Sequence, residues 1–252
     1  MRRQLCHGSS VTEGTSVVGG LVLWDLDGTL LRWAVERVHE GTHEAVVRER
    51  FRGQVSPLAE TRGLTDYELL VALVPSPFLP PAPCSQDLAD LLAELDQRCV
   101  GRDISGALRV NPELLAVVAD AELLGWRNLI LTGNTRARAE WKLSSVGLLG
   151  AFDWDNSTFG SEPLSRVALC AAAVARCRER FGPSVPVVVV GDSRRDIAAA
   201  KMAGVPIVAT TWAGDTSADL SLWGADLVVG DGGLSGRDLL EWLRKASGSQ
   251  EH

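Results

Sequence analysis

The sequence LVLWDLDGTLL, residues 21–31, sets the architecture that the rest of the chain follows. It begins with an apolar run that stops at Asp25, which predicts a short strand buried on both faces. Asp25 and Asp27 are two positions apart and point to the same side, so they repel unless a cation or a proton lies between them. Gly28 allows a tight turn, and Thr29 can hydrogen-bond within it. The pattern predicts a magnesium site, and the plainer alternative is an Asp-Gly turn without a ligand.

Apolar segments of the same kind recur farther along the chain. They are NLILTGN at 128–134, VPVVVVGDS at 185–193, VPIVATTW at 205–212 and, more weakly, ADLVVGD at 225–231. Helical patterns separate several of them and stop at glycine, a common residue just beyond a helix end. These helices are expected over 135–146, 163–181 and 196–203. Strands that alternate with helices need crossover connections, so the sequence predicts an α/β fold with a doubly wound parallel sheet.

Acidic and hydroxyl side chains stand at the carboxyl ends of the predicted strands, where ligands bind in parallel sheets. They are Asp25, Asp27, Thr132, Asp192 and Asp196. Carboxylates from separate strands can converge on one site, and Mg²⁺ prefers such hard oxygen ligands. Thr132 precedes a predicted helix, where its hydroxyl and nearby N–H groups suit a phosphoryl oxygen. By itself it would be an ordinary helix cap.

About 100 residues separate the first two predicted strands, far more than the ~10–12 of a minimal crossover. Helical spacing covers 34–51, 66–74 and 87–100, and the proline-rich PSPFLPPAPC at 75–84 cannot continue a helix. We therefore expect a small helical cap over the strand ends, where it would exclude water and select the substrate. The expected division is a leader at 1–19, a core at 20–31 and 108–245, a cap at 32–107 and a tail at 246–252.

The chain of 252 residues carries 32 Asp and Glu against 25 Lys and Arg, a formal net charge of −7. This balance provides no broad positive field, so nucleic acid and anionic membranes are not expected as partners. No apolar run approaches the ~18 residues of a membrane span. The five cysteines include no CxxC motif, so reduced thiols and a cytoplasmic location are expected.

The segments LVLWDLDGTLL, LILTGN and VVVVGDSRRDIAAAKMAG occur in the order and at the spacing of motifs one, two and four of the haloacid dehalogenase superfamily. The chain resembles this family from about Leu21 to Val229. In addition, GLTDYELL at 63–70 is similar to a segment of phosphoglycolate-phosphatase-like members. The resemblance implies a Rossmann-like core with a helical cap, and a Mg²⁺-dependent phosphatase that acts on a small-molecule phosphate ester.

The resemblance also implies a role for each motif residue. Asp25 would attack phosphorus and form an aspartyl-phosphate, while its carboxylate also contacts Mg²⁺. Asp27 would protonate the leaving oxygen and later activate water, with its backbone carbonyl on the metal. Thr132 would hydrogen-bond the phosphoryl group. Asp192 would ligate Mg²⁺ directly, and Asp196 would support the metal site.

The third motif of the family supplies a cation, usually lysine, and here the sequence departs from the common form. Arg166, in FGSEPLSRVAL, is the favoured candidate because a guanidinium is always charged and its fork of donors suits phosphate. Lys142 is the competitor, but its place on the helix after Thr132 is typical of a solvated lysine.

Further residues are expected to contact the substrate: Gly28, Thr29, Arg32, Arg62, Thr65, Gly133 and Asn134. Arg32 and Trp33 replace the acid or serine that many members carry after DGTLL, which argues against phosphoglycolate as the substrate; the alternative is that they mark a hinge. Thr65 has helix capping as an equal alternative. His39 and His43 have the spacing of a metal-binding pair, but without a third ligand they are expected to be a surface pair.

The expected function is hydrolysis of a phosphomonoester. A sugar phosphomutase would use the same aspartyl-phosphate and stays an alternative within enzymes. A phospho-acceptor regulatory domain or a binding protein is the alternative from another class. The long insertion argues against the regulatory domain, and the presence of all four acids argues against lost catalysis. Substrate identity, oligomeric state and the choice between Arg166 and Lys142 are left open by the sequence.

Overall fold

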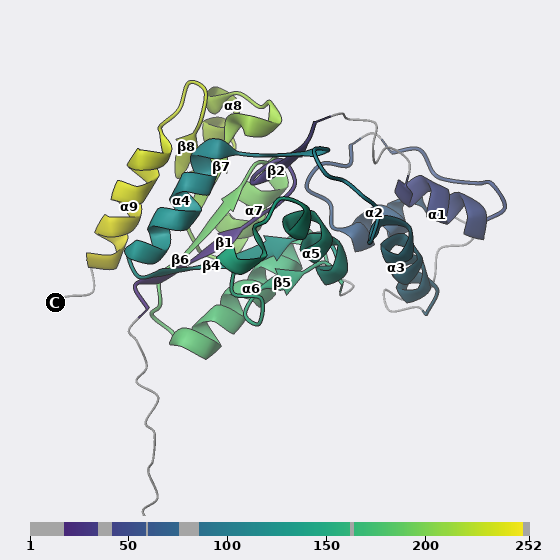
Figure 1. Ribbon diagram of the computed structural model, residues 1–252, viewed down its shortest axis with the longest axis horizontal. Helices are drawn as coiled ribbons and strands as arrows, with labels where there is room; N and C mark the ends of the chain where they lie inside the picture. The colour runs from purple at the N-terminus through teal and green to yellow at the C-terminus, as the bar shows by residue number, and fades with distance from the viewer. Residues whose placement is uncertain (1–17, 35–41, 59, 76–85, 162–163, 249–252) are drawn as a thin grey trace, which may run out of the picture.

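The computed structural model describes residues 18–34, 42–58, 60–75, 86–161 and 164–248. Its centre is a six-stranded parallel sheet with the strand order β5-β4-β1-β6-β7-β8 (Figure 1). The strands are β1 (Gly20–Trp24), β4 (Trp126–Thr132), β5 (Thr158–Phe159), β6 (Val187–Gly191), β7 (Ile207–Thr210) and β8 (Leu227–Val229). The predicted doubly wound α/β class is confirmed, because the strand order reverses on either side of β1, the first strand in the sequence.

Helices cover both faces of this sheet. They are α4 (Pro112–Leu123), α5 (Arg136–Ser145), α6 (Arg166–Phe181), α7 (Arg194–Met202), α8 (Ser217–Leu222) and α9 (Gly236–Gly248), with short 3-10 helices η3 (Leu149–Ala151) and η4 (Thr211–Ala213). Side chains alternate along β1, so Val22 and Trp24 pack in one cluster with α4, α5 and α9. Leu21 and Leu23 pack in the other, with α6, α7 and α8. The apolar run at residues 21–24 is therefore buried on both sides, as predicted.

The chain leaves the core through β2 (Leu31–Trp33) and returns through β3 (Leu108–Val110), and these strands pair antiparallel. Between them lie α1 (Thr42–Arg50), α2 (Asp66–Leu73) and α3 (Gln86–Cys99), which pack on one another at the right of Figure 1. We call residues 34–107, which contain these three helices, the helical insertion. The predicted limits of the cap, 32 and 107, fall at this two-stranded ribbon.

Some elements differ from the expectation drawn from the sequence. The strand predicted at 185–193 is shortened to β6, because Asp192 and Ser193 form the turn into α7 instead of extending the sheet. The strands β2, β3 and β5 lie outside the predicted strands; they are two or three residues long and depend on pairing rather than on a local pattern. Helix α4 is also additional, although Asn111 caps it and Pro112 begins it, which is an ordinary start signal.

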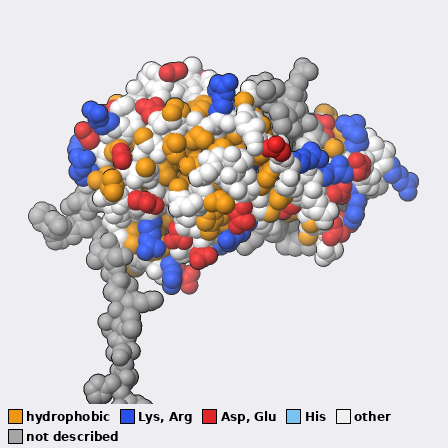
Figure 2. Space-filling view, in the orientation of Figure 1, with side chains coloured by type: hydrophobic (Ala, Val, Ile, Leu, Met, Phe, Trp, Pro, Cys, Tyr) orange, Lys and Arg blue, Asp and Glu red, His pale blue; other side chains and the backbone are white. Residues whose placement is uncertain are grey.

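Several expectations fall outside the described residues: those for 1–17 of the leader, 35–41 of the first cap helix, 76–84 of the proline-rich break and 249–252 of the tail. The last helix runs to Gly248, past the predicted end of the core at residue 245. Within the described ranges, no helix is both long and apolar enough to cross a membrane. On the face seen in Figure 2, acidic and basic side chains lie among one another around hydrophobic ones.

Candidate active site

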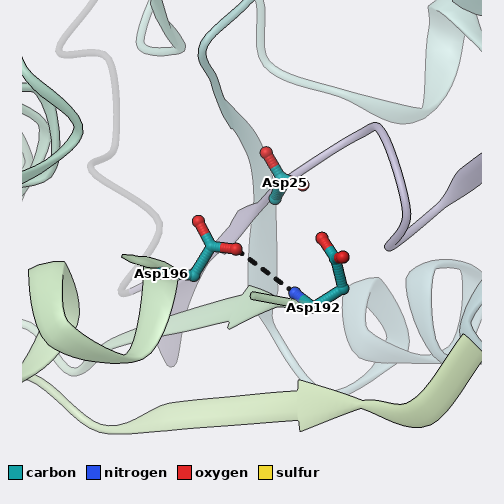
Figure 3. Close-up of side chains that lie close together, drawn as sticks. All are labelled: Asp25, Asp192 and Asp196. Atoms are coloured by element: carbon teal, nitrogen blue, oxygen red, sulfur yellow. Dashed lines mark hydrogen bonds between the residues drawn. The ribbon is translucent and has the colours of Figure 1, made fainter. Parts of the chain in front are cut away.

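Three aspartates from separate parts of the chain converge at the carboxyl end of the sheet. Asp25 follows β1 directly and Asp192 follows β6; these strands are parallel neighbours, so their ends lie side by side. Asp196 lies in the first turn of α7. One carboxylate oxygen of each lies within 4.8 Å of the others, and all three side chains are buried (Figure 3). Such a group of hard oxygen donors suits a divalent cation such as Mg²⁺.

The turn after β1 shapes this acidic cluster. The Thr29 hydroxyl lies 3.2 Å from Oδ2 of Asp25 and 3.3 Å from Oδ1 of Asp192, so it can donate to either carboxylate. Gly28 has a φ of 86°, and a Cβ there would lie 2.5 Å from Oδ2 of Asp192. Both the backbone conformation and the space therefore require glycine at this position.

The three carboxylates crowd negative charge into a buried volume. Burial raises the pKa of Asp25 well above its usual value, and the neighbouring acids raise it further against the effect of Arg166. Burial, followed by the proximity of Asp196, raises the pKa of Asp192 to about 7 despite Arg62. A divalent cation would relieve this repulsion, so the residues present fit a metal ion.

Asp196 is held differently from the other two acids. Its Oδ1 accepts a hydrogen bond of 2.7 Å from Nε of Arg166, and its Oδ2 accepts from the Ser193 hydroxyl at 2.6 Å and the Ser193 backbone N–H at 3.0 Å. The bond from the Ser193 N–H, together with one of 3.2 Å from the Asp196 N–H to the Ser193 hydroxyl, forms a capping box at the start of α7. Both oxygens of Asp196 have short hydrogen bonds, so this residue is suited to support the site. Asp25 and Asp192 each have one oxygen that faces only the shared Thr29 hydroxyl, at 3.2 and 3.3 Å, so these two are suited to contact a metal.

Arg166, the favoured third-motif cation, lies inside this cluster. It is the first residue of α6, its side chain is buried, and its Nη2 lies 2.8 Å from Oδ1 of Asp25. The same guanidinium contacts Asp196. A cation that touches the predicted nucleophile fits the role that the resemblance implies for the third motif.

Lys142 also lies in the site, and the expectation of a solvated lysine is wrong. Only 1% of its surface is exposed. Its Nζ lies 2.5 Å from Oδ2 of Asp27 and 2.8 Å from Oδ1 of Asn134. The lysine therefore contacts the predicted acid/base, whereas Arg166 contacts the predicted nucleophile.

Asp27 receives two donors on one oxygen. Asn134 Nδ2 donates to its Oδ2 at 2.7 Å, beside the contact from Lys142. Burial by itself would raise the pKa of Asp27, but the Lys142 ammonium and the Asn134 amide outweigh burial and lower it. Its other oxygen, Oδ1, is buried and has no hydrogen-bond partner among the described residues. Asp27 is thus held as a carboxylate, and its Oδ1 has no competing hydrogen bond from the described residues.

A cavity of about 220 Å³ connects these residues with the helical insertion. Asp25, Asp27, Asp192, Lys142 and Arg166 line it from the core, together with Trp33 and the predicted loop residues Thr132, Gly133 and Asn134. From the insertion it is lined by His43, Thr61, Arg62, Gly63, Leu64, Asp66 and Leu69. The cavity therefore brings most of the predicted site residues to one place, beneath residues of the insertion.

Four predicted substrate contacts do not line the cavity: Gly28, Thr29, Arg32 and Thr65. Gly28 and Thr29 lie instead in the turn beside the acidic cluster. Arg32 donates a 3.1 Å hydrogen bond to the backbone carbonyl of Trp212, and its guanidinium lies 5.4 Å from the centroid of the Trp212 ring. Its neighbour Trp33 lines the cavity instead. Thr65 is fully buried and caps α2, with Glu68 completing a capping box, which is the alternative stated for it.

Arg62 reaches from the insertion to the core. Its Nε donates to Oδ2 of Asp192 at 2.9 Å, and its Nη2 donates to the backbone carbonyl of Asp192 at 2.8 Å. The same Nη2 is paired with Asp215. The residue was predicted to contact substrate, and the structure places it in the cavity lining, on Asp192 of the acidic cluster.

A second buried cluster surrounds Asp66, and the partners of Asp66 in it were not predicted. Asp66, at the start of α2, is paired with Arg138 of α5 and lies 2.9 Å from Nε2 of His43. His43 therefore lines the cavity and is not part of an exposed pair; its sequence partner His39 lies outside the described residues. Arg138 and Lys142 are four residues apart and lie on one face of α5. This spacing, on the helix that follows Thr132, is the sequence signal that could have placed both residues at the site.

The family model for haloacid dehalogenase-like hydrolases matches residues 20–204. No curated protein matches the chain.

Solved structures share the fold at low sequence identity. CbbY from Rhodobacter sphaeroides, in complex with phosphate, is 21% identical with a TM-score of 0.57, over 87% of this chain and 99% of that one. A haloacid dehalogenase-like family hydrolase from Streptococcus pneumoniae is 17% identical with a TM-score of 0.53, over 88% and 97%. A predicted phosphatase from Clostridium acetobutylicum is 17% identical with a TM-score of 0.53, over 91% and 98%.

Proposed function

The chain belongs to the haloacid dehalogenase-like hydrolase family, and on this basis we propose that it is a Mg²⁺-dependent phosphatase that hydrolyses a small-molecule phosphomonoester through an aspartyl-phosphate. The observation that carries the proposal is the position of Asp25. Its carboxylate belongs to the acidic cluster, contacts Arg166 and lines the cavity that Asp27 also lines. Nucleophile, cation and acid/base are thereby assembled around one space.

The metal would be held by the carboxylates of Asp25 and Asp192 and by the backbone carbonyl of Asp27, with Asp196 fixing the surroundings. When bound, Mg²⁺ neutralises charge that otherwise keeps a carboxylate away from a phosphate dianion.

In the first half-reaction, a carboxylate oxygen of Asp25 bonds to phosphorus while the ester P–O bond breaks. The leaving oxygen takes a proton from the carboxyl form of Asp27 and departs as an alcohol. Arg166 stabilises the transferring phosphoryl group with charged hydrogen bonds, and Thr132 donates its hydroxyl to a phosphoryl oxygen.

In the second half-reaction, a water attacks phosphorus of the aspartyl-phosphate, and the carboxylate form of Asp27 takes its proton. The contacts of Asp27 with Lys142 and Asn134 favour this carboxylate form. Phosphate leaves, Asp25 is restored, and the proton on Asp27 serves the next leaving group.

The test is hydrolysis of p-nitrophenyl phosphate in Mg²⁺. We expect the native chain to be active, EDTA to remove the activity and Asp25→Asn to abolish it. Asp120→Asn makes the same chemical change at an exposed position on α4 and should keep full activity. Equal inactivity of the native chain and Asp25→Asn across a panel of phosphomonoesters would favour a binding or regulatory protein. Conversion of one sugar phosphate isomer to another in the presence of the bisphosphate would favour a phosphomutase.

The proposed location is the cytoplasm. The described cysteines Cys99, Cys170 and Cys177 are buried and free, which fits the reduced thiols expected from the sequence.

A further inference from the structure

The charges that line the active-site cavity are balanced one to one. Four carboxylates and four cationic side chains lie in its wall. Each acid has its own partner: Asp25 with Arg166 at 2.8 Å, Asp27 with Lys142 at 2.5 Å, Asp192 with Arg62 at 2.9 Å, and Asp66 with Arg138. Among the described lining residues, no arginine or lysine is left over to meet a second anionic group.

This balance persists when the proposed chemistry takes place. If a metal occupies the oxygens of Asp192, Arg62 still has Asp215 and the backbone carbonyl of Asp192. If Asp25 carries a phosphoryl group, Arg166 still has Asp196. The second partners Asp196 and Asp215 add negative charge outside the lining. A divalent cation would therefore supply about the charge that one phosphate dianion needs, without a surplus for another anion.

His43 does not alter this conclusion. Its Nε2 lies 2.9 Å from Oδ1 of Asp66 and 3.5 Å from Nη1 of Arg138. The imidazole thus faces a carboxylate that is already paired with a guanidinium. Its Nε2 contacts Asp66 of the insertion and Arg138 of α5.

The other described residues of the wall carry no charge. Trp33, Leu64 and Leu69 contribute apolar surface to the cavity. A charged group placed against this surface would lose its hydration without gaining a partner, which disfavours it strongly.

The cavity is also small. Its volume is about 220 Å³. Pockets for drug-sized ligands begin at about 300 Å³. The phosphoryl group takes part of this space, so little is left for the alcohol.

The geometry points to a substrate class: the phosphate monoester of a small alcohol that carries no second charged group. This inference rests on the proposed phosphatase function and narrows it. Phosphorylated carboxylic acids and bisphosphates are expected to be poor substrates because of their second charge, and nucleoside monophosphates because of their size.

The test compares esters that differ in one group. Glycerol 3-phosphate and 3-phosphoglycerate have the same carbon chain, with a neutral CH₂OH in one and a carboxylate in the other. We expect kcat/KM to be at least about tenfold higher for glycerol 3-phosphate, and adenosine monophosphate to be hydrolysed more slowly still. Calorimetric titration of Asp25→Asn with the first two esters should show the same order of affinity without turnover.

A variant of the wall sharpens the comparison. Leu69→Lys adds a cation without a partner, so the preference for glycerol 3-phosphate should shrink or reverse. Leu69→Met keeps the volume and the neutrality and should keep the preference. Thermal unfolding checks that both variants fold. If Leu69→Lys does not fold, the comparison of the two esters with the native chain tests the inference.

Equal or faster hydrolysis of 3-phosphoglycerate or adenosine monophosphate by the native chain would overturn the inference and leave the phosphatase function standing. Failure to hydrolyse p-nitrophenyl phosphate would instead contradict the proposed function itself.

Discussion

At the scale of single residues, the structure gives different positions to Arg166 and Lys142, the two candidates for the third-motif cation. Arg166 contacts Asp25 and Asp196, whereas Lys142 contacts Asp27 and Asn134. Because each cation faces a different carboxylate, the two are not interchangeable in the proposed mechanism. Arg166 would act on the transferring phosphoryl group, and Lys142 would keep Asp27 in place as a carboxylate.

Replacing Lys142 with methionine tests the second of these roles. We expect kcat for p-nitrophenyl phosphate to fall about 10- to 100-fold, because Asp27 loses the contact that favours its base form. The ratio kcat/KM should fall much less, since nitrophenolate leaves without a proton. Phosphoenzyme should accumulate, giving a burst of nitrophenolate in stopped flow.

Lys201→Met, at an exposed lysine that pairs with Asp226 on the surface, is the matched control and should behave as the native chain. A loss in kcat and kcat/KM by equal factors, without a burst, would show that Lys142 does not act through Asp27.

Gly28 allows a second test at this scale. Gly28→Ala places a methyl group 2.5 Å from Asp192 at a φ of 86°, whereas Gly53→Ala has nearly the same φ of 85° but nothing within 4 Å. Both should lose about 1 kcal/mol of stability from backbone strain. Only Gly28→Ala should lose Mg²⁺-dependent hydrolysis, and equal activities of the two variants would contradict the proposed geometry around Asp192.

The sequence identified the acids of the site because each follows an apolar strand. It could not identify the buried positions of Lys142, Arg138 and His43, because a charged residue on a helix is solvated by default. Only the arrangement of α5 against the insertion shows that these side chains are buried or line the cavity.

At the scale of elements, the start of α2 is attached to the loop that follows β4. The backbone N–H of Asp66 donates to the carbonyl of Gly133 at 2.8 Å, and its Oδ2 accepts from the backbone N–H of Thr135 at 3.0 Å. A Cβ on Gly133 would lie 2.7 Å from the Cα of Thr65, so glycine permits this close approach. The insertion is thereby fixed to the loop that would bind the phosphoryl group.

Asp66→Asn should weaken this attachment and the whole fold. Breaking a buried ion pair costs about 3–5 kcal/mol, measured as the free energy of unfolding in urea at pH 7. Burial raises the pKa of Asp66, but Arg138 and His43 outweigh burial and lower it. The stabilisation is therefore complete above the unfolded value of about 3.9 and is lost as the pH falls below it toward the folded value.

The difference between the native chain and Asp66→Asn should accordingly shrink below about pH 4. Asp87→Asn removes an exposed partner of Arg50 and should change stability by less than about 1 kcal/mol at any pH. A difference for Asp66→Asn that stays constant down to the acid transition would contradict the ionic contribution.

The long strands and their order along the chain could be predicted because each is a continuous apolar run between helical patterns. The strands β2, β3 and β5 could not, because no continuous apolar run marks them in the sequence. Of the wall that the insertion contributes, the sequence identified Arg62 but not His43 or Leu69, since these two helix residues acquire their role only from what they pack against.

At the scale of the whole molecule, the described core and insertion enclose the cavity together, and a bound ion should stabilise the assembled structure. Mg²⁺ at 100 times its Kd should raise the free energy of unfolding by about 2.7 kcal/mol, seen as a higher Tm. Asp192→Asn should lose this increase, and the exposed-site variant Asp120→Asn should retain it. A Tm that does not respond to Mg²⁺ in the native chain would contradict the proposed metal site.

The central claim is that Asp25 becomes phosphorylated during turnover. Acid quenching of the native chain while it hydrolyses p-nitrophenyl phosphate, followed by peptide mass spectrometry, tests it most directly. We predict one phosphoryl group on the peptide that contains Asp25, released by hydroxylamine and absent from Asp25→Asn. Phosphate found on another residue, or hydrolysis that proceeds at an undiminished rate in Asp25→Asn, would contradict the account.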